Sequence, residues 1–160
     1  MTAKTGETTF TTPSDREFCA IRAFDAPREL VWEAYTEPRH LQKWMGGYEG
    51  WEWVTCEVDL RPGGEYRFEW RKDDGSELAI SGVHQEVEPP ERMVTTESWG
   101  PGWPEALNTI VFTEEDGRTT ISITVLYPSK EARDAAIATG MSDGMSVSFD
   151  QLDRVVADLS

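Results

Sequence analysis

The C-terminal segment of the chain has the pattern of one amphipathic helix. Apolar residues recur at spacings of three and four over residues 142–159, at Met145, Phe149, Leu152, Val156 and Leu159. Aspartates occupy the other side of the same segment. A helix with one apolar side must bury that side against another element, so the pattern predicts a long closing helix whose partner lies upstream.

The middle of the chain alternates with a period of two, which is typical of strands. The clearest run is EYRFEWR, in which Tyr66, Phe68 and Trp70 alternate with charged residues. Strands are predicted over residues 16–24, 51–60, 65–71, 78–87, 93–99, 107–113 and 119–127. In the second of these we expect Val54, Cys56, Val58 and Leu60 on one side. Tight turns between consecutive runs, such as Pro62-Gly63-Gly64, favour antiparallel pairing.

Three shorter helices complete the prediction. Pro27 suits a first helical position, and the buried stripe of that helix is expected at Leu30, Val31, Ala34 and Tyr35. Pro38 ends it and opens a second helix through Trp44, and Ser129 caps a third that ends at Gly140. The order predicts an α+β domain in which a closing helix covers the apolar face of an antiparallel sheet. Residues 1–15 are expected to be a flexible lead-in to a single domain over residues 16–160.

Composition narrows the classes of partner. The chain has 15 Lys and Arg against 30 Asp and Glu, and this net charge of -15 repels nucleic acids and anionic membrane surfaces. The two cysteines, Cys19 and Cys56, fit reduced thiols in a cytoplasmic protein. We expect no metal, no cofactor, no nucleic acid and no membrane partner, and a homodimer is left open.

Aromatic residues supply the candidate binding surface. Seven Trp, six Phe and four Tyr provide more planar surface than a chain of 160 residues needs for its core. Large aromatic and Met side chains suit a planar apolar ligand, and a plain aromatic core is the alternative. The ligand-binding candidates are Trp44, Trp51, Trp53, Tyr66, Phe68, Trp70, His84, Trp99, Trp103, Met141, Met145 and Phe149.

Two titratable residues are candidates for proton chemistry. His84 lies in the middle of a predicted strand, and Glu97 shares a strand face with Trp99, where burial would raise the pKa of its carboxyl. Glu69 is expected to face water opposite Trp70, and His40 is expected to be exposed. Because no second acid or base is placed beside either candidate by the sequence, we favour binding over catalysis.

Four motifs resemble a known family. FDAPRELVWEAYTEPRHLQKW, DLRPGGEYRF, EVEPPERMV and SKEARDAAIATGM are similar to the family related to the activator of the heat-shock-protein-ninety ATPase, in the START-like (SRPBCC) superfamily. The resemblance implies a helix-grip fold, a curved antiparallel sheet wrapped around a long C-terminal helix, with two short helices after the first strand. Relatives carry a Trp-Trp-Gly-Pro-like run where this chain has Trp44-Met45-Gly46-Gly47, which predicts a softer loop at the cavity mouth.

Three functions are consistent with that resemblance. The first is binding of a small hydrophobic or aromatic molecule in a cavity between the sheet and the C-terminal helix. The second is a cyclase- or dehydratase-type enzyme, related to the polyketide cyclases, that uses His84 or Glu97 in the cavity. The third is an interaction module that activates a chaperone ATPase. The fold is shared by proteins of different function, so the site must decide among them.

Overall fold

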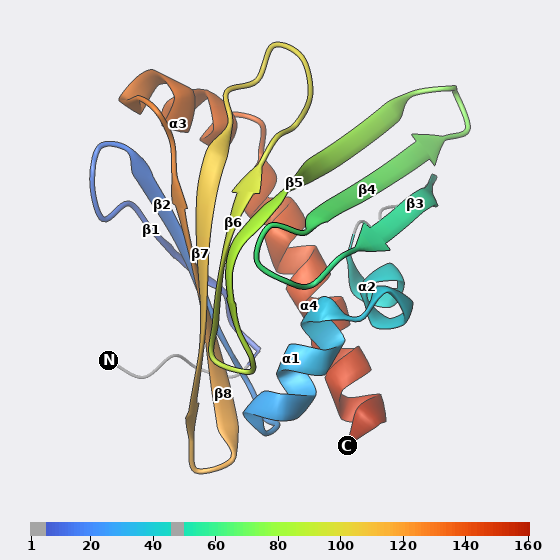
Figure 1. The fold of residues 1–160 in the computed structure, drawn as a ribbon, viewed down its shortest axis with the longest axis vertical. Coiled ribbons are helices and arrows are strands. Elements are labelled where there is room, and N and C mark those ends of the chain that lie inside the picture. The colour runs from blue at the N-terminus through green and yellow to red at the C-terminus, as the bar shows by residue number, and fades with distance from the viewer. Residues whose placement is uncertain (1–5, 46–49) are drawn as a thin grey trace.

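The computed structural model describes residues 6–45 and 50–160. Figure 1 shows the elements of this part of the chain, which are β1 (Thr9–Thr11), β2 (Glu17–Phe24), α1 (Arg28–Thr36), α2 (Pro38–Trp44), β3 (Trp51–Val58), β4 (Glu65–Lys72), β5 (Glu77–Glu88), β6 (Arg92–Glu97), β7 (Ala106–Glu115), β8 (Arg118–Leu126), α3 (Lys130–Ile137) and α4 (Met141–Leu159). The predicted element order is confirmed, with β1 as an additional strand.

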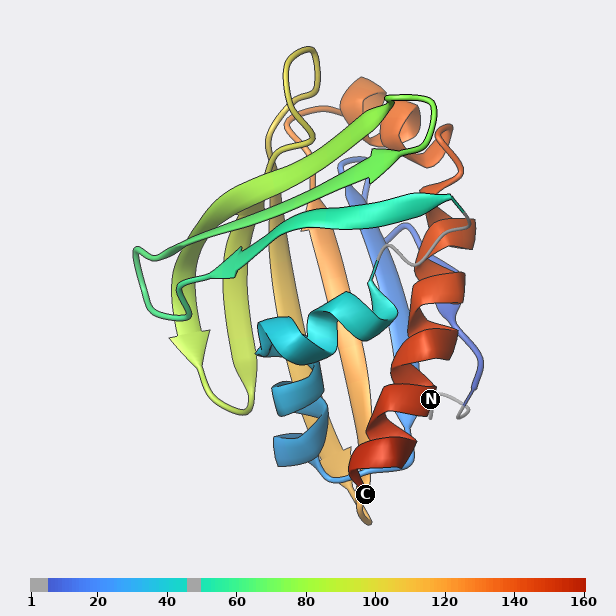
Figure 2. The same ribbon diagram turned by 90° about the vertical axis from the view of Figure 1, so that its right-hand side faces the viewer.

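The strands form one open, curved antiparallel sheet in the order β1-β2-β8-β7-β6-β5-β4-β3. Strands β3 to β8 follow one another as a meander, β2 pairs with β8, and β1 lies at the edge beside β2. Figure 2 shows β3, β4 and β5 arching across the top of the molecule while α4 runs along one side. This α+β arrangement, with α1 and α2 after the first long strand, is the helix-grip fold that the resemblance implies.

Alternation in the sequence explains the two faces of the sheet. In β4, Tyr66, Phe68 and Trp70 are buried while the residues between them face outward. In β8, Ile121, Ile123 and Val125 are buried in the same way. Both runs were predicted with these faces, so the concave face of the sheet is apolar and aromatic as expected.

Strand β5 bends the sheet where the site lies. Its first half pairs with β4 and its second half with β6, and the register shifts between His84 and Glu86. Gly82 stands at the bend, where a Cβ atom would lie only 1.9 Å from the carbonyl oxygen of Thr96. The close approach therefore requires glycine, and it places His84 on the concave face.

Helix α4 is anchored at its C-terminal half. Leu152, Val155 and Val156 are buried there. Arg22 of β2, which is 2 % exposed, donates to the carboxylate of Asp150 at 2.8 Å and to that of Asp153. A buried guanidinium is costly without partners, so these pairs fix this half of the helix on the sheet. The first half contributes Met141, Gly144 and Met145, which are only partly buried.

Four details of the sequence analysis are corrected. A bulge between Trp53 and Thr55 turns Val54 outward, where it is 52 % exposed. Thr9–Thr11 pair with β2 as β1, although residues 1–15 show no strand pattern. Pro27 is the N-cap and the helix begins at Arg28. The buried stripe of α1 includes Trp32, which packs at 5.0 Å from the ring of Phe112, whereas Leu30 is only partly buried.

Helices α3 and α4 begin at identifiable caps. Ser129 caps α3 as predicted, because its hydroxyl accepts from the backbone N–H of Ala132 at 3.1 Å. Gly140 lies beyond the end of α3 in a left-handed conformation with φ 82°, and there it is the N-cap of α4.

None of the helices in the described ranges has the length and apolarity needed to cross a membrane.

Two valines on α4 test the anchoring. Val156→Ala removes two buried methyl groups, so we expect it to lower the free energy of unfolding by about 2 kcal/mol, measured by urea denaturation. Val147→Ala is the matched control, since Val147 is 45 % exposed on the same helix. It should change stability by less than about 0.5 kcal/mol. Equal losses in the two variants would contradict the anchoring.

Candidate functional site

A cavity of about 600 Å³ lies between the concave face of the sheet and the first half of α4. Its walls come from α1, α2, β3 to β8, the loop after β6 and the start of α4. The lining residues are Tyr35, Trp44, Met45, Trp51, Trp70, Leu78, Ile80, Glu97, Trp99, Trp103, Asn108, Ile123, Val125, Tyr127, Thr139, Gly140, Met141, Gly144, Met145, Ser148 and Phe149. The cavity borders the first half of α4, whereas the second half is buried and ion-paired to Arg22.

A smaller chamber of about 100 Å³ continues the cavity toward the bend of the sheet. Residues that line both chambers are Tyr35, Met45, Ile80, Glu97 and Asn108. The inner chamber adds Tyr66, Phe68, His84 and Thr95, together with aliphatic residues of α2, β3, β6 and β7. The larger chamber is therefore mainly aromatic, and the inner chamber holds several polar side chains.

Glu97 lies at the junction of the two chambers. One carboxylate oxygen accepts from the indole N–H of Trp99 and the other from the side-chain amide of Asn108, each at 3.0 Å. The register explains the second contact, because Asn108 pairs with Thr95 and so lies diagonally across from Glu97 on the same face. Burial raises the pKa of the Glu97 carboxyl, although both hydrogen bonds act against that rise.

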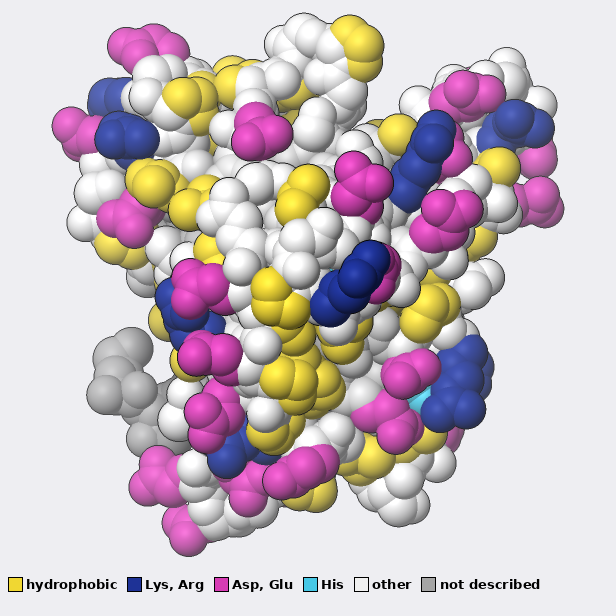
Figure 3. Space-filling model, in the orientation of Figure 1, with side chains coloured by type: hydrophobic (Ala, Val, Ile, Leu, Met, Phe, Trp, Pro, Cys, Tyr) yellow, Lys and Arg dark blue, Asp and Glu magenta, His cyan; other side chains and the backbone are white. Residues whose placement is uncertain are grey.

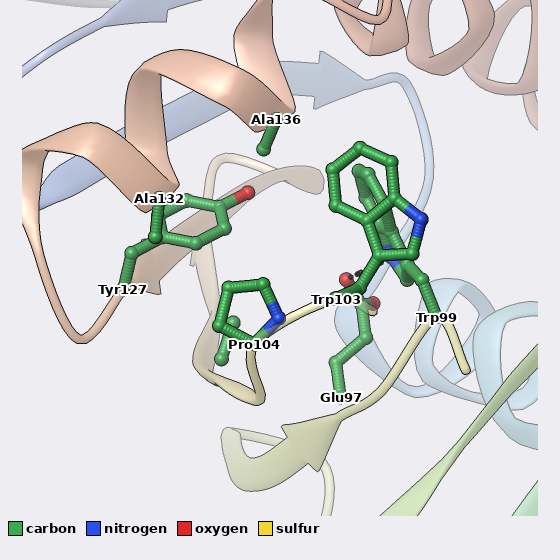
Figure 4. A pocket seen from close by; sticks show the side chains of 8 residues that line it. Glu97, Trp99, Trp103, Pro104, Tyr127, Ala132 and Ala136 are labelled. Carbon is green, nitrogen blue, oxygen red and sulfur yellow. Dashed lines mark hydrogen bonds between the residues drawn. The ribbon is translucent and has the colours of Figure 1, made fainter. Parts of the chain in front are cut away.

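Figure 4 shows the surroundings of Glu97 on the side of α3. The carboxyl points toward the indoles of Trp99 and Trp103, and the ring of Tyr127 lies across from them with Pro104 between. These side chains border a cleft of only about 10 Å³ that also touches α3. The rings of Trp99 and Trp103 lie 5.1 Å apart. Glu97 is therefore enclosed by aromatic groups on this side.

Three tyrosines surround the carboxyl. Burial raises the pKa values of Tyr35, Tyr66 and Tyr127, and the negative charge of Glu97 raises each of them further. The hydroxyl of Tyr66 donates to the carbonyl of Thr96 at 2.6 Å. The hydroxyls therefore stay protonated at neutral pH and present donors and acceptors without charge.

His84 is buried in the inner chamber and is 4 % exposed. Its ring lies 5.3 Å from that of Tyr66, and neither ring nitrogen has a hydrogen-bond partner among the described residues. Burial lowers the pKa of His84, and the charge of Asp59 opposes that shift only in part. The imidazole is therefore neutral at pH 7 and offers one free donor and one free acceptor.

The other aromatic candidates divide by position. Trp44, Trp51, Trp70, Trp99 and Trp103 line the larger chamber together with Met141, Met145 and Phe149, whereas Tyr66 and Phe68 line the inner one. Trp103 is 40 % exposed and lies at the mouth. Trp53 lines neither chamber, because it packs 4.6 Å from the ring of Trp70 and its indole N–H donates to the carbonyl of Met45.

Two polar candidates outside the cavity are also placed. Glu69 faces outward as predicted, beside Arg67 at 3.2 Å. The prediction that His40 is exposed is wrong: it is 5 % exposed, and its Nε2 lies 3.3 Å from the carboxylate of Glu33 on α1. The segment packs its polar side against α1, which the short pattern of α2 did not indicate. The predicted soft loop at Gly46-Gly47 lies outside the described residues.

Sequence reasoning missed Tyr35, Asn108 and Tyr127 among the polar residues of the site. Asn108 shares a strand face with Ile110 and Phe112, and Tyr127 extends the alternation of Ile123 and Val125, so a period of two carried through these runs would have found both. Tyr35 was placed in the core stripe of α1, but it also borders both chambers.

Neither cysteine lines the two chambers as the structure describes them. The described ranges contain no group of three or more His, Cys, Asp and Glu side chains that could hold a metal ion. Cys19 and Cys56 are free thiols, and burial raises the pKa of Cys56 to about 11, so its thiol is protonated at neutral pH. The arrangement can instead enclose an apolar ligand, hydrogen-bond its polar atoms and exchange a proton with it.

Comparisons with known proteins agree with the fold. Residues 25–157 match the family model described as activator of Hsp90 ATPase homolog 1-like protein. A crystal structure of a Rhodobacter sphaeroides protein is similar, with 29% identity, a TM-score of 0.88 and coverage of 96% of this chain and 100% of that one. A Mycobacterium smegmatis protein has 25% identity, a TM-score of 0.81 and coverage of 93% and 96%, respectively. A search of curated proteins finds no match.

The carboxyl of Glu97 makes stability depend on pH. Because the pKa of Glu97 is raised in the folded state, the folded protein keeps a proton that the unfolded chain releases. The free energy of unfolding of the wild type, relative to that of Glu97→Gln, should therefore fall with rising pH. The fall should begin above pH 4.5, the ordinary pKa of a Glu carboxyl, and end once the pH exceeds the raised pKa of Glu97. Urea unfolding of both proteins from about pH 4 to about pH 8 measures the difference. A difference that is constant or rises with pH would contradict a raised pKa.

Proposed function

This chain belongs to the family described as activator of Hsp90 ATPase homolog 1-like protein, and we propose that it binds a small apolar or aromatic molecule between its sheet and α4. The observation that carries the proposal is the cavity of about 600 Å³. Ligand sites commonly have volumes of about 300–1,000 Å³. Protein interiors are otherwise close-packed, and a space of this size leaves its walls without contact atoms. Its presence supports a role in binding.

Unpartnered polar atoms support the same proposal. Both ring nitrogens of His84, the side-chain oxygen of Asn108 and the indole nitrogen of Trp70 are buried without hydrogen-bond partners in the described structure. All three residues line the chambers. Buried polar groups normally have partners, and leaving one unpaired costs roughly 1–3 kcal/mol. A ligand with a few polar atoms on an apolar body would supply the missing partners.

The first half of α4 offers a route of entry. Met141, Gly144 and Met145 face the cavity from a part of the helix that is only partly buried, and Gly140 precedes it with φ 82°. Methionine side chains adapt their shape at low cost, and glycine readily adopts the left-handed conformation seen at Gly140. This half of the helix can therefore move to admit a ligand while the anchored half stays fixed.

A cyclase- or dehydratase-type enzyme is a second candidate, because His84 and Glu97 line the same inner chamber. A neutral imidazole and a carboxyl with a raised pKa form the acid–base pair that proton transfer near pH 7 requires. Binding without reaction remains the primary proposal. The two groups also serve as polar contacts for a bound ligand, and no third catalytic group is needed to explain them.

The family description also names activation of the Hsp90 ATPase, which gives a third candidate. A chaperone would contact the outer surface of the protein. The polar and aromatic residues described above lie inside the cavity, so they do not bear on that role. Stimulation of the chaperone ATPase by this protein would favour it, and unchanged turnover would count against it.

A cavity-filling variant tests ligand binding. N-phenyl-1-naphthylamine is an uncharged aromatic probe that fluoresces in apolar sites, so we expect the wild type to enhance its emission. Ile123→Trp places an indole into the cavity from β8 and should weaken binding by about tenfold or more. Val111→Trp is the control, because Val111 lies on the opposite face of β7 from the buried Ile110. Equal binding by all three proteins would place the probe outside the cavity.

Solvent deuterium distinguishes binding from catalysis. Small molecules that remain with the purified protein are extracted, incubated with it in D₂O and weighed by mass spectrometry. The molecules are returned to H₂O before weighing, so that deuterium on nitrogen and oxygen is lost, and binding alone then predicts an unchanged mass. Exchange or elimination catalysed by His84 and Glu97 predicts a mass change that Glu97→Gln slows by about a hundredfold or more. The second outcome would replace ligand binding by the enzymatic alternative.

A further inference from the structure

We propose that the cavity selects organic cations, so that its ligand carries a protonated amine or quaternary ammonium group beside Glu97. The inference rests on the proposed function, because it requires that a ligand enters the cavity. It goes further in naming the chemical class of the ligand: an apolar or aromatic body with one positive charge. The argument uses the charges, the hydrogen bonds and the aromatic faces of the two chambers.

The charge of the lining has one sign. Among the described residues around both chambers, Glu97 is the only Asp or Glu, and none is Lys or Arg. His84 does not alter this balance, because burial favours its neutral form. An enclosed carboxylate without a basic partner is the electrostatic complement of a cation.

The hydrogen bonds of Glu97 fit the ionised carboxylate. Trp99 and Asn108 both donate to it, one to each oxygen. A protonated carboxyl would need an acceptor, and the amide group that Asn108 directs at Glu97 is a donor. Two donors favour the charge, yet burial still raises the pKa of the carboxyl. A positive group would provide the stabilisation that the empty cavity lacks.

Aromatic rings near Glu97 suit the same ligand. Tyr35, Trp99 and Tyr127 line the chamber around the carboxyl, and the faces of such rings attract cations. One such contact already exists with a cation from outside the lining, where the ammonium of Lys72 lies 5.8 Å from the ring of Trp51. The net charge of -15 also draws cations toward the protein, and Figure 3 shows acidic side chains spread over the face in view.

Ligands of other charge fit less well. A carboxylate ligand would place a second negative charge near Glu97, with only the neutral imidazole of His84 to receive it. A neutral ligand could occupy the cavity but would leave the cost of burying the carboxylate unchanged. The lining therefore predicts the order cation, neutral molecule, anion for ligands with the same apolar body.

The proposal predicts coupling to protons. A cation favours the ionised form of Glu97, so its binding releases a proton, and its affinity should rise as the pH rises through the raised pKa of this carboxyl. The titratable groups that face Glu97 are Tyr35 from α1, Tyr66 from β4, His84 from β5 and Tyr127 after β8. The tyrosines remain protonated, since their pKa values are raised, and the lining residues of α4 are not titratable.

Three matched probes test the selection. The probes are 2-(1-naphthyl)ethylamine, 2-(1-naphthyl)ethanol and 1-naphthylacetate, which share one ring system and differ in charge. Calorimetric titration at about pH 8 should give the amine about tenfold higher affinity than the alcohol, and the acetate the weakest binding. Between about pH 5 and about pH 8 the affinity of the amine should rise while that of the alcohol stays constant.

Two variants test whether the charge of Glu97 causes the preference for the amine. Glu97→Gln should reduce the preference for the amine to less than about twofold, because the amide keeps the size of the side chain and removes its charge. Glu57→Gln removes the same charge from the exposed outer face of β3 and should leave the preference intact. Thermal melting checks the folding of both variants. If Glu97→Gln does not fold, the pH dependence of the wild type decides.

The outcomes separate the two proposals. Equal affinity for the alcohol and the amine would overturn the selection of cations, and so would a preference for the amine that Glu97→Gln retains. Either result would leave the proposal of ligand binding in place. Failure of all three probes and of N-phenyl-1-naphthylamine to bind would contradict the proposed function itself.

Discussion

The ion pairs between Arg22 and the two aspartates of α4 are the constraint on which the cavity depends. A guanidinium that is 2 % exposed must stay paired, so the second half of α4 cannot move away from β2. The buried Leu152 packs in the same region. The first half of the helix presents Met141 and Met145 to the cavity instead. One helix thus closes the core at one end and borders a binding site at the other.

The bend of the sheet and the pairing of its strands position the polar side chains of the cavity. Gly82 brings β5 against β6, which sets His84 in the inner chamber, and the register of β6 with β7 sets Asn108 beside Glu97. Aromatic rings line the cavity around the carboxyl, and the indole N–H of Trp99 donates to it. Removing a carboxylate from water costs free energy, which supports a role for Glu97 in recognition.

Local patterns account for most of the fold and for part of the site. Alternation placed Tyr66 and Trp70 on the concave face, and the spacing of apolar residues defined α4. The inward position predicted for Val54 was wrong, because a bulge adds one residue and reverses the alternation. Strand β1 was not predicted, because it depends on pairing with β2. The depth of the cavity could not be predicted at all, since periodicity shows which side of a helix is buried but not how far that side lies from the sheet.

Chemical-shift mapping tests the central claim most directly. In protein labelled at methionine and valine methyl groups, N-phenyl-1-naphthylamine bound in the cavity should shift the resonances of Met141 and Met145, which line it. The methyl resonances of Val155 and Val156, which lie in the anchored half of α4, should not move. Shifts confined to the valines, or found only on the outer face of the sheet, would contradict a ligand site between the sheet and the first half of α4.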